Sequence, residues 1–516
     1  MAYLGAPILW VTVLAPVALA VAGLLLRDNS GKTYRLLAYT GALLLLVPAV
    51  LVLYYSYTGT LVAGVIDPVA IDLSDYRIGR MMLVLDGLSS PVVLGISVVT
   101  ALVSIYSIRY MTHRIREMEE HGEKVPGFNV YYALYAGFAA SMLGMAYASN
   151  LILFFIFLEL SLLTSFALIA YYGYGDRGRI SLLYFIWTHI AGALFLAGVL
   201  YYGLNRGTFD VVVELGGSIG YISPSPSYQY LNLAVAAIIL GLFVKMAVFG
   251  VHMWLPYAHA EAPTPVSALL SPNLIGIAGY ALARFVYPLF PGIIEASKTL
   301  LLSLAILTIV YGGLVAIRQV DFKRFLAYSS VSQMGYMLLG LATLTSMGIG
   351  GAMLHYLSHA IGKAILFMVA GVFITELGTR DITRMGGLAR RYPIMAAATL
   401  LGFMHLVGIP PALGMWSEVL IVYGLFDGIT VASQAMLWGI TLVLILAFMV
   451  TAAYSFIMMR KIFFGQPRIE ASEYMDDFKA TIVLVGALGV FFFVAIGTLS
   501  EPLRVASELL AGVIGG

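Results

Sequence analysis

The stretch KMAVFGVHMWLPYAHAEAPTPVS, from Lys245 to Ser267, decides the fold that this sequence predicts. It continues an apolar run that starts near Leu231, and no acidic residue stands beside the lysine in the sequence. An ammonium group at the centre of a bilayer helix costs about 2.5 to 3.5 kcal/mol on insertion scales, so this lysine is expected to face protein or water. Glycine and proline follow at once and predict a broken helix whose freed backbone groups are satisfied inside the protein. These residues are Gly250, Pro256, Pro263 and Pro265.

The composition of the whole chain is that of a membrane protein. Of its 516 residues, 61% are hydrophobic and 10% are charged, whereas roughly 25% are charged in an ordinary soluble domain. A net charge of +2 argues against nucleic acid as a partner. The lack of cysteine excludes disulfides, thiol catalysis and cysteine-ligated iron–sulfur or zinc sites, so electron transfer is expected in another polypeptide. Few amide side chains and no cysteine also suggest a thermophile.

Fourteen stretches have the length and apolarity of a membrane-spanning helix, for which about 20 residues are needed. They are residues 6–26, 34–55, 83–107, 129–147, 150–172, 180–203, 230–252, 272–291, 298–318, 325–344, 348–375, 394–424, 433–460 and 478–499. The fold class is therefore predicted to be an all-α polytopic membrane protein. The first stretch lacks the flanks of a signal peptide and is expected to be retained. Residues 58–80 predict a small extracytoplasmic hairpin.

Basic residues predict the orientation of these helices. Of the 28 Lys and Arg, 20 lie in loops that follow odd-numbered helices, and only five lie in loops on the other side. By the positive-inside rule the odd loops are cytoplasmic and both termini are extracytoplasmic. Segments 113–124 and 321–324 are expected to be cytoplasmic surface. Arg284, near the extracytoplasmic end of helix 8, is expected to extend toward the membrane interface.

One pattern recurs after five helices. Helix 7 carries Lys245 before a break, and helix 12 breaks at Gly408-Ile-Pro-Pro411 and then carries Glu418. Because a shift of five helices reverses orientation, helices 4–8 and 9–13 are predicted to be inverted repeats with broken helices 7 and 12. The predicted domains are residues 1–128 (helices 1–3 and the hairpin), 129–291 (first repeat), 298–460 (second repeat) and 461–516 (helix 14 and C-terminus).

Further ionisable side chains lie inside the predicted helices. Glu159 stands within FFIFLELSLL, where an intramembrane carboxylate is functional by default, with a structural hydrogen bond to a hydroxyl as the alternative. His252 shares a face with Lys245 if helix 7 stays regular that far. Glu418 either carries protons or caps the second half of helix 12, and His405 is a further candidate close to the same break.

Helix 11 carries three titratable residues at spacings of four. His355, His359 and Lys363 form one stripe along the helix, which favours a relay over a single buried histidine. Two histidines four residues apart can also bind zinc. No third ligand accompanies them in the sequence, so no metal site is predicted.

Three segments carry a resemblance to a known family. They are KMAVFGVHMWLPYAHAEAPTPVSALL (245–270), DFKRFLAYSSVSQMG (321–335) and HAIGKAILF (359–367). These segments resemble the antiporter-like proton-translocating subunits of respiratory complex I. The same family includes the D subunit of Mrp-type sodium/proton antiporters and the matching subunits of energy-converting membrane-bound hydrogenases. The resemblance covers about residues 80 to 460.

The resemblance implies a central axis of charged residues that moves ions. The positions that match it are Glu159, Lys245, His252, His259, His355, His359, Lys363 and Glu418, with His405 and Glu261 as additional candidates. Two positions depart from the family pattern. Gly276 stands where many relatives have a lysine in helix 8, and Gln333 stands where some have a histidine in helix 10. The link between the two half-channels is therefore expected to use water, histidine or hydroxyl groups.

The function predicted from this sequence is translocation of H⁺ or Na⁺ by a membrane subunit of a redox-driven complex, either complex I-like or a membrane-bound hydrogenase or oxidoreductase. Glu159 is expected to hold Lys245 charged and to release it. No cofactor and no redox chemistry is predicted in this chain. Iron–sulfur, nickel–iron, flavin or quinone cofactors are expected in partner subunits. The expected partners are other membrane subunits, the lipid bilayer and, indirectly, a hydrophilic redox module. The alternatives are an Mrp-type antiporter subunit without a redox partner and a non-pumping structural subunit.

Overall fold

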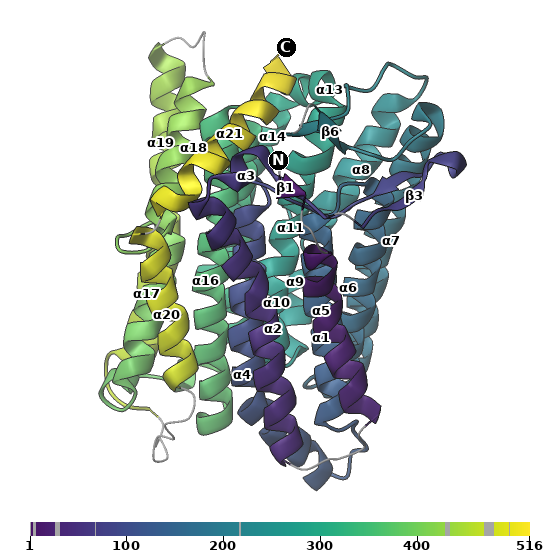
Figure 1. The fold of residues 1–516 in the computed structure, drawn as a ribbon. Helices are drawn as coiled ribbons and strands as arrows, with labels where there is room; N and C mark the ends of the chain where they lie inside the picture. Colours follow the sequence, from purple (N-terminus) through teal and green to yellow (C-terminus); the bar gives the residue numbers. More distant parts are fainter. Residues whose placement is uncertain are drawn as a thin grey trace.

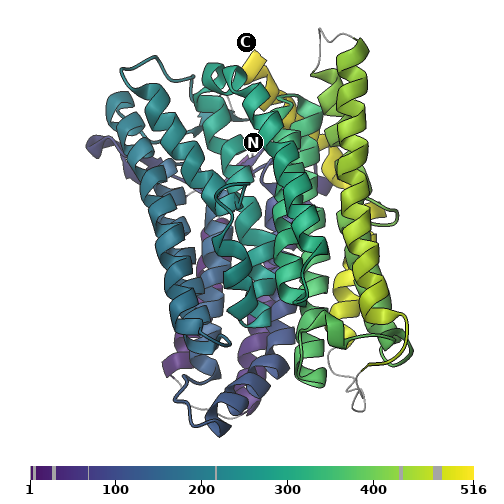
Figure 2. The ribbon, with the colours of Figure 1, turned by 180° about the vertical axis from the view of Figure 1, so that it is seen from behind.

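The computed structural model of this chain describes residues 2–3, 7–25, 31–67, 69–215, 218–428, 434–468, 479–494 and 496–515. Long helices that run side by side fill most of it, as Figure 1 shows from one side and Figure 2 from behind. Among the described residues, nine helices are long and apolar enough to cross a membrane, or up to ten if a bent pair at the C-terminal end counts as one span. The prediction of an all-α polytopic membrane protein is confirmed.

A helix or a pair of half-helices lies at each of the predicted spans. The N-terminal part contains α1 (Ile8–Leu25), α2 (Gly31–Tyr57), α3 (Thr60–Ala63) and α4 (Ser90–Glu120). The next part contains α5 (Phe128–Tyr147), α6 (Leu151–Tyr172), α7 (Arg177–Arg206), α8 (Leu231–Met246) and α9 (Trp254–Glu261). An almost unbroken helical run follows, made of α10 (Thr264–Leu269), the π-helical turn η2 (Leu270–Leu274), α11 (Ile275–Ala281), the π-helical turn η3 (Leu282–Val286) and α12 (Tyr287–Leu289).

The remaining helices complete the second half of the chain. They are α13 (Pro291–Ala296), α14 (Lys298–Ile317), α15 (Phe322–Ala342), α16 (Ser346–Leu377), α17 (Pro393–Val407), α18 (Gly414–Asp427), α19 (Gln434–Phe463), α20 (Lys479–Val494) and α21 (Ile496–Gly515). Two helices extend further than the sequence predicted. Helix α4 continues beyond the apolar run to Glu120, where an ion pair between Arg114 and Glu117 (2.9 Å) supports it. The eighth span begins at Thr264, because Pro265 fits the first turn of a helix, where no N–H donor is needed.

Short strands lie at one end of the bundle, the end at which Figure 1 labels β1, β3 and β6. β1 (Ala2–Tyr3) pairs in parallel with β2 (Val65–Ile66), which pairs antiparallel with β5 (Val84–Leu85). The predicted hairpin contains β3 (Ile71–Leu73) and β4 (Gly79–Met81), and β6 (Val212–Leu215) pairs with β7 (Ser218–Tyr221). The C-terminal end of α21 lies at this same end of the bundle, as expected for an even number of spans.

Both predicted broken helices are present. Helix α8 ends at Met246, where Ala247 adopts a left-handed conformation (φ 56°) and the N–H of Val248 bonds the carbonyl of Phe243 (3.1 Å). The chain re-enters a helix at Trp254. Helix α17 likewise ends before Gly408 (φ 71°), a conformation that costs a non-glycine residue about 1 to 2 kcal/mol. Each break leaves backbone groups that the surrounding helices must satisfy.

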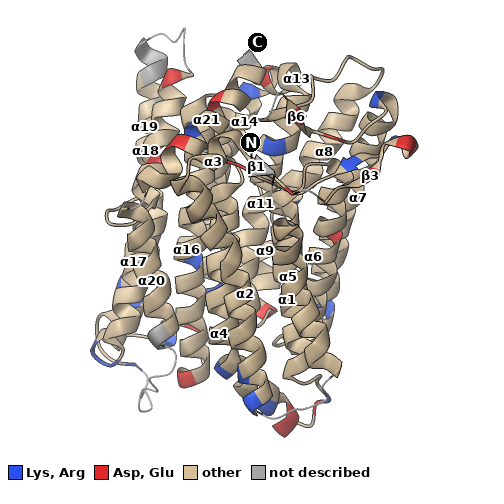
Figure 3. Ribbon diagram, viewed as in Figure 1, with Lys and Arg blue, Asp and Glu red and all other residues tan. Residues whose placement is uncertain are grey.

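Helix α16 occupies the core. It packs against α4, α10, α15, α17, α18, α20 and α21 and is buried along most of its length. Figure 3 shows that Lys, Arg, Asp and Glu lie mainly toward the two ends of the bundle. Charged residues between those ends are therefore few. Because a charge at membrane depth is costly, these residues are the candidates for a functional role.

Candidate functional site

Lys245 lies in the last turn of α8, directly before the break. Its side chain is buried (3% exposed), and its Nζ has no hydrogen-bond partner among the residues that the structure describes. The indole N–H of Trp254, at the start of α9, donates to the carbonyl of Val244 (2.8 Å) and ties the two half-helices together. The break thus places the buried amino group of Lys245 at the C-terminal end of α8.

Glu159 of α6 has a direct partner that the sequence analysis missed. Its Oε2 lies 3.0 Å from Nδ1 of His189 on α7. Its Oε1 is buried without a hydrogen-bond partner. Glu159 also interacts electrostatically with Lys245, but the two make no ion pair within 4.0 Å. His189 stands in the apolar run YFIWTHIAGALF, so the same reasoning that singled out the other histidines could have found it.

His252 does not share a helix face with Lys245, because α8 ends six residues before it. It lies in the break itself, and its ring packs against those of Tyr311 of α14 (5.0 Å between centroids) and Tyr328 of α15 (6.3 Å). Its Nδ1 has no hydrogen-bond partner. The break therefore points His252 toward the second half of the molecule.

His259 of α9 brings the two halves into contact. It is fully buried, neither ring nitrogen has a hydrogen-bond partner, and its ring stacks on that of Phe367 on α16 (5.1 Å). Phe367 lies one turn beyond Lys363, and His259 interacts electrostatically with Lys363. The first half thus reaches the titratable stripe of α16 through His259.

All three members of the predicted stripe on α16 are fully buried. Lys363 donates from Nζ to the carbonyl of Leu326 (2.8 Å) and to the hydroxyl of Ser329, both on α15. His359 has no hydrogen-bond partner, and its ring lies 6.5 Å from that of His355. The stripe therefore runs without interruption through the core of the second half.

The end of the stripe faces α17 and α18. Nδ1 of His355 lies 3.3 Å from the hydroxyl of Ser417 on α18. His405 of α17 lies 3.0 Å, through Nδ1, from the hydroxyl of Ser358, which neighbours His359 on α16. His405 is fully buried and its Nε2 has no partner. The structure thus brings His405 to the stripe.

Glu418 does not cap α18. It is the fifth residue of that helix, makes no capping hydrogen bond, and has a buried Oε1 without a partner. Its Oε2 lies against Gly408, where a methyl group would overlap it. An apolar groove of about 880 Å³ between α18 and α19 opens beside this carboxyl group.

The structure leaves no room for a side chain at Gly276. A methyl group there would overlap the ring of Tyr356 on α16. Tyr356 donates its hydroxyl to the carbonyl of Asn273 (3.0 Å), whose side-chain amide is buried without partners. Gln333 is also buried and donates to the carbonyl of Leu406 (3.1 Å).

Glu261 belongs to a separate charged cluster at the end of α9. Its Oε1 lies 3.3 Å from Nη2 of Arg380, whose Nε lies 2.6 Å from Oδ2 of Asp321. Lys323 is fully buried and donates to the carbonyls of Ala260 (3.4 Å) and Ala262. The expectation that segment 321–324 is only surface is therefore wrong for Lys323, because its ammonium group satisfies carbonyls freed where α9 ends.

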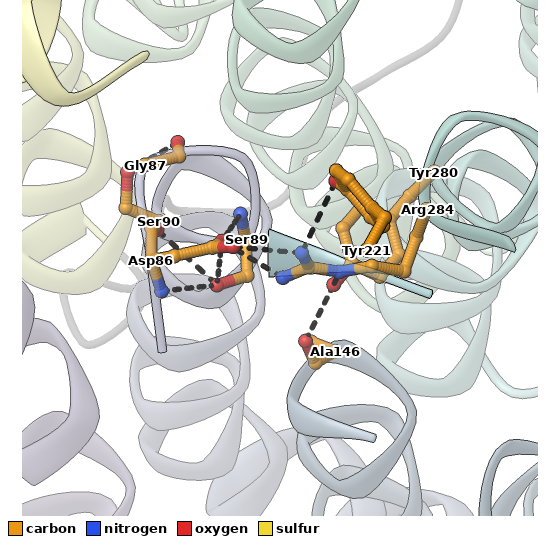
Figure 4. A network of polar contacts seen from close by, with 8 residues as sticks. All are labelled: Asp86, Gly87, Ser89, Ser90, Ala146, Tyr221, Tyr280 and Arg284. Atoms are coloured by element: carbon orange, nitrogen blue, oxygen red, sulfur yellow. Dashed lines mark hydrogen bonds and ion pairs between the residues drawn. The ribbon is translucent and has the colours of Figure 1, made fainter. Parts of the chain in front are cut away.

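Arg284 does not extend to an interface, as the sequence analysis expected. It is 1% exposed and makes two hydrogen bonds to Asp86, Nη1–Oδ2 2.7 Å and Nη2–Oδ1 2.8 Å. Figure 4 shows this pair with Tyr280, which accepts from Nε of Arg284 (2.8 Å) and donates to the carbonyl of Ala146 (2.8 Å). The buried carboxylate of Asp86 allows the guanidinium group of Arg284 to be buried as well. That these two residues meet could not be inferred from the sequence.

The described residues contain no group of three or more His, Asp or Glu side chains that could hold a metal ion. What they contain is a file of buried amines, imidazoles and carboxyls with unused hydrogen-bonding atoms. Buried polar atoms are normally paired, and groups of this kind gain and lose protons. The arrangement therefore fits proton or cation transfer.

Comparisons with known proteins identify the family of this chain. A family model described as "NADH:quinone oxidoreductase/Mrp antiporter, TM" matches residues 148–449. The chain is 32% identical to subunit M of the F420H2 dehydrogenase of Methanosarcina mazei over 419 residues, 79% of each chain. It is 31% identical to subunit M of the NADH-quinone oxidoreductase of Rhodobacter capsulatus over 366 residues, 68% of this chain and 70% of the relative.

Solved structures show the same fold over nearly the whole length. A chain of respiratory complex I from Thermus thermophilus matches with a TM-score of 0.82 and 25% identity, covering 98% of this chain and 100% of the other. A chain of the Mrp complex from Dietzia sp. matches with a TM-score of 0.78 and 20% identity, covering 98% and 99%. The chain belongs to the NADH:quinone oxidoreductase/Mrp antiporter transmembrane family.

Proposed function

We propose that this chain is an ion-translocating membrane subunit of a redox-driven complex and that it moves protons, or Na⁺, along a buried axis. The observation that carries this proposal is the file of ionisable groups inside the bundle, most of which are buried and keep a hydrogen-bonding atom without a partner. Its members are Glu159, Lys245, His252, His259, His355, His359, Lys363, His405 and Glu418. Of these, Lys363 is buried but paired with Leu326 and Ser329, and the side chain of Glu159 is 19% exposed. The named relatives, subunits of F420H2 dehydrogenase and NADH-quinone oxidoreductase, support coupling to a redox reaction.

The axis consists of two halves that meet at His259. The first half contains Glu159 and Lys245 at the break after α8, and the second contains the stripe of α16 and ends at Glu418. His359, in the second half, and the amide of Asn273 are both buried and unpartnered. The imidazole can pass a proton where the lysine of helix 8 is absent, and the amide can hold by hydrogen bonds a water molecule that completes the chain.

The rest of the complex supplies the driving reaction. Iron–sulfur, nickel–iron, flavin or quinone cofactors reside in partner subunits, and other membrane subunits and lipid surround this chain. Residues 129–291 and 298–460 act as the two inverted repeats, flanked by residues 1–128 and 461–516. The chain lies in the cell membrane with both termini extracytoplasmic.

The test uses the complete complex reconstituted in vesicles. Lys245→Ala and Lys363→Ala are expected to lower the number of ions moved per electron about tenfold or more while the complex still assembles, because each removes a buried charge that the axis requires. Lys461→Ala, at an exposed position at the end of α19, is the control and should leave this ratio unchanged. An unchanged ratio in both buried-lysine variants would show that the chain is a structural subunit.

The polypeptides that copurify with this chain decide between the redox-coupled function and its closest alternative. A hydrophilic redox module is the expected result. Copurification with antiporter subunits alone, together with Na⁺/H⁺ exchange in the absence of any electron donor, would instead identify an Mrp-type antiporter subunit.

A further inference from the structure

The ion pair between Glu159 and His189 lies at the outer surface of the bundle. The side chain of His189 is 53% exposed and that of Glu159 is 19% exposed, whereas Lys245 is 3% exposed. Both partners lie within helices that span the membrane. A histidine at such a position is expected to act with a partner, because ionisable side chains at membrane depth are costly.

Helix α7 is shaped to hold the carboxyl group of Glu159. One turn before His189, the ring of Phe185 stacks on the imidazole (5.4 Å between centroids, 9° between planes). Less than one turn after it, Gly192 leaves the space that Oε1 of Glu159 occupies, and a methyl group there would overlap this oxygen. The carboxyl group therefore lies in a notch of α7, with one oxygen on the imidazole and the other against a glycine.

The same helix supports the break beside Lys245. Trp187 of α7 donates its indole N–H to the carbonyl of Val251 in the break (3.3 Å). Tyr184, one turn earlier, packs against Trp254 (5.4 Å between centroids), which in turn bonds the carbonyl of Val244. Helix α7 thus contacts the break close to His189. A change at His189 can therefore affect Lys245 through the contacts that Trp187 and Tyr184 make with the break.

Two basic side chains are available to one carboxylate. His189 holds Glu159 directly, and Lys245 interacts with it electrostatically while its Nζ has no partner. Tyr184 also faces Glu159. No ionisable group of α5, α8, α9 or α10 makes a hydrogen bond or ion pair with either Glu159 or His189.

We propose that His189 is a positioning residue that competes with Lys245 for the carboxylate of Glu159. This inference rests on the proposed function. A protonated His189 holds Glu159 in the notch through a charge-assisted hydrogen bond and leaves Lys245 free to give up its proton. A neutral His189 holds it less strongly, so Glu159 can turn toward Lys245 and stabilise its charge. Histidine suits this task because its charge ordinarily changes between about pH 5 and 8.

The experiment measures ions moved per electron by the complete complex in vesicles from pH 5.5 to 8. His189→Gln keeps a neutral hydrogen-bond donor. Because glutamine does not change its charge, we expect the number of ions moved per electron to depend less on pH in this variant than in the wild type. His189→Arg supplies a permanent charge, and we expect a loss of about tenfold at every pH because Glu159 stays in the notch. If His189→Gln shows the complete wild-type profile, the imidazole is only a structural donor and the proposal is overturned.

A double variant tests whether His189 acts through Glu159. The loss in Glu159→Gln/His189→Gln should equal the loss in Glu159→Gln alone, since His189 has nothing left to position. Additive losses would overturn the proposal. Lys245→Ala reports separately on the proposed function. If Lys245→Ala lowers pumping and the His189 variants do not, only the role of His189 fails.

The notch itself offers a matched pair of variants on one helix. Gly192→Ala should displace the carboxyl group and lower pumping as the His189 variants do, whereas a methyl group on Gly178 meets no atom within 4 Å, so Gly178→Ala should pump normally. Both changes replace glycine in α7 by the residue with the highest helix propensity, and electron-transfer activity shows that each complex has assembled. Wild-type pumping in an assembled Gly192→Ala complex would overturn the proposal.

Discussion

Single residues show which parts of the site a sequence can reveal. Lys245, Lys363 and Glu418 are charges in apolar runs, and the cost of burying a charge makes each of them visible without a structure. Their contacts are not visible in this way. The partner of Glu159 is His189, and the ring of Tyr356 packs against Gly276. Both facts depend on how side chains from different helices meet, which no spacing within one helix encodes.

The buried pair between Arg284 and Asp86 gives a prediction about stability. Asp86→Ala removes both hydrogen bonds from Arg284 and those from Ser89, and leaves a guanidinium buried without its counter-ion, which should cost about 3 to 5 kcal/mol. The expected result is a clear fall in the thermal unfolding midpoint of the complex or failure of the subunit to accumulate.

An exposed pair provides the control for this change. Arg504 bonds Glu501 (2.7 Å) and Glu508 (2.6 Å) on the surface of α21, where screening by solvent leaves such pairs little effect on stability. Arg504→Ala should therefore shift the unfolding midpoint much less. Equal shifts in the two variants would contradict the assignment of a structural role to the buried pair.

The two breaks are the elements that place the charged groups, and the sequence predicted both from glycine and proline. Where each helix resumes was not predicted, because this depends on tertiary hydrogen bonds such as that from Trp254 to Val244. The same holds for the length of α4 and the start of α10, which lie beyond the apolar runs. Apolar length measures the membrane-embedded part of a helix and not its full extent.

Gly408 combines a left-handed backbone conformation with a close contact to Glu418, and a substitution there tests both. Gly408→Ala places a side chain in a left-handed conformation, at a cost of about 1 to 2 kcal/mol, and pushes it into Oε2 of Glu418. Gly378 ends α16 in the same conformation (φ 62°), but a methyl group there meets nothing within 4 Å.

The two variants distinguish the effect of backbone strain from the effect of a contact with Glu418. Both variants should lower the unfolding midpoint by similar amounts, whereas only Gly408→Ala should lower the number of ions moved per electron. Vesicle measurements on the two assembled complexes check this. A pumping loss in Gly378→Ala as large as that in Gly408→Ala would mean that backbone strain alone explains the effect.

At the scale of the whole molecule, the sequence predicted the fold class and the family, because apolarity over long stretches and three segments that resemble a known family carry that information. It did not predict what holds the two halves together. Arg380, at the end of α16, bonds Glu261 of the first half and Asp321 of the second, while Lys323 bonds the carbonyls on both sides of Glu261. This cluster fixes the end of α9 against α15.

Arg380→Ala should weaken this connection. The change leaves two carboxylates without their shared partner and is expected to cost about 1 to 3 kcal/mol. Arg384 lies on the same segment but is exposed, so Arg384→Ala should stay within about 0.5 kcal/mol of the wild type. Thermal unfolding of both variants measures the difference, and indistinguishable midpoints would show that the cluster does not stabilise the assembly.

The ring of Tyr356 opposite Gly276 also affects kinetics. A phenol cannot swing across a gap with a positive charge as a flexible alkylammonium can, so under the proposed function a proton crosses between the halves only when several O–H and N–H bonds rearrange together. Such concerted transfer slows when deuterium replaces hydrogen. Turnover of this complex should therefore show a larger solvent isotope effect in D₂O than that of a relative with lysine at the same position.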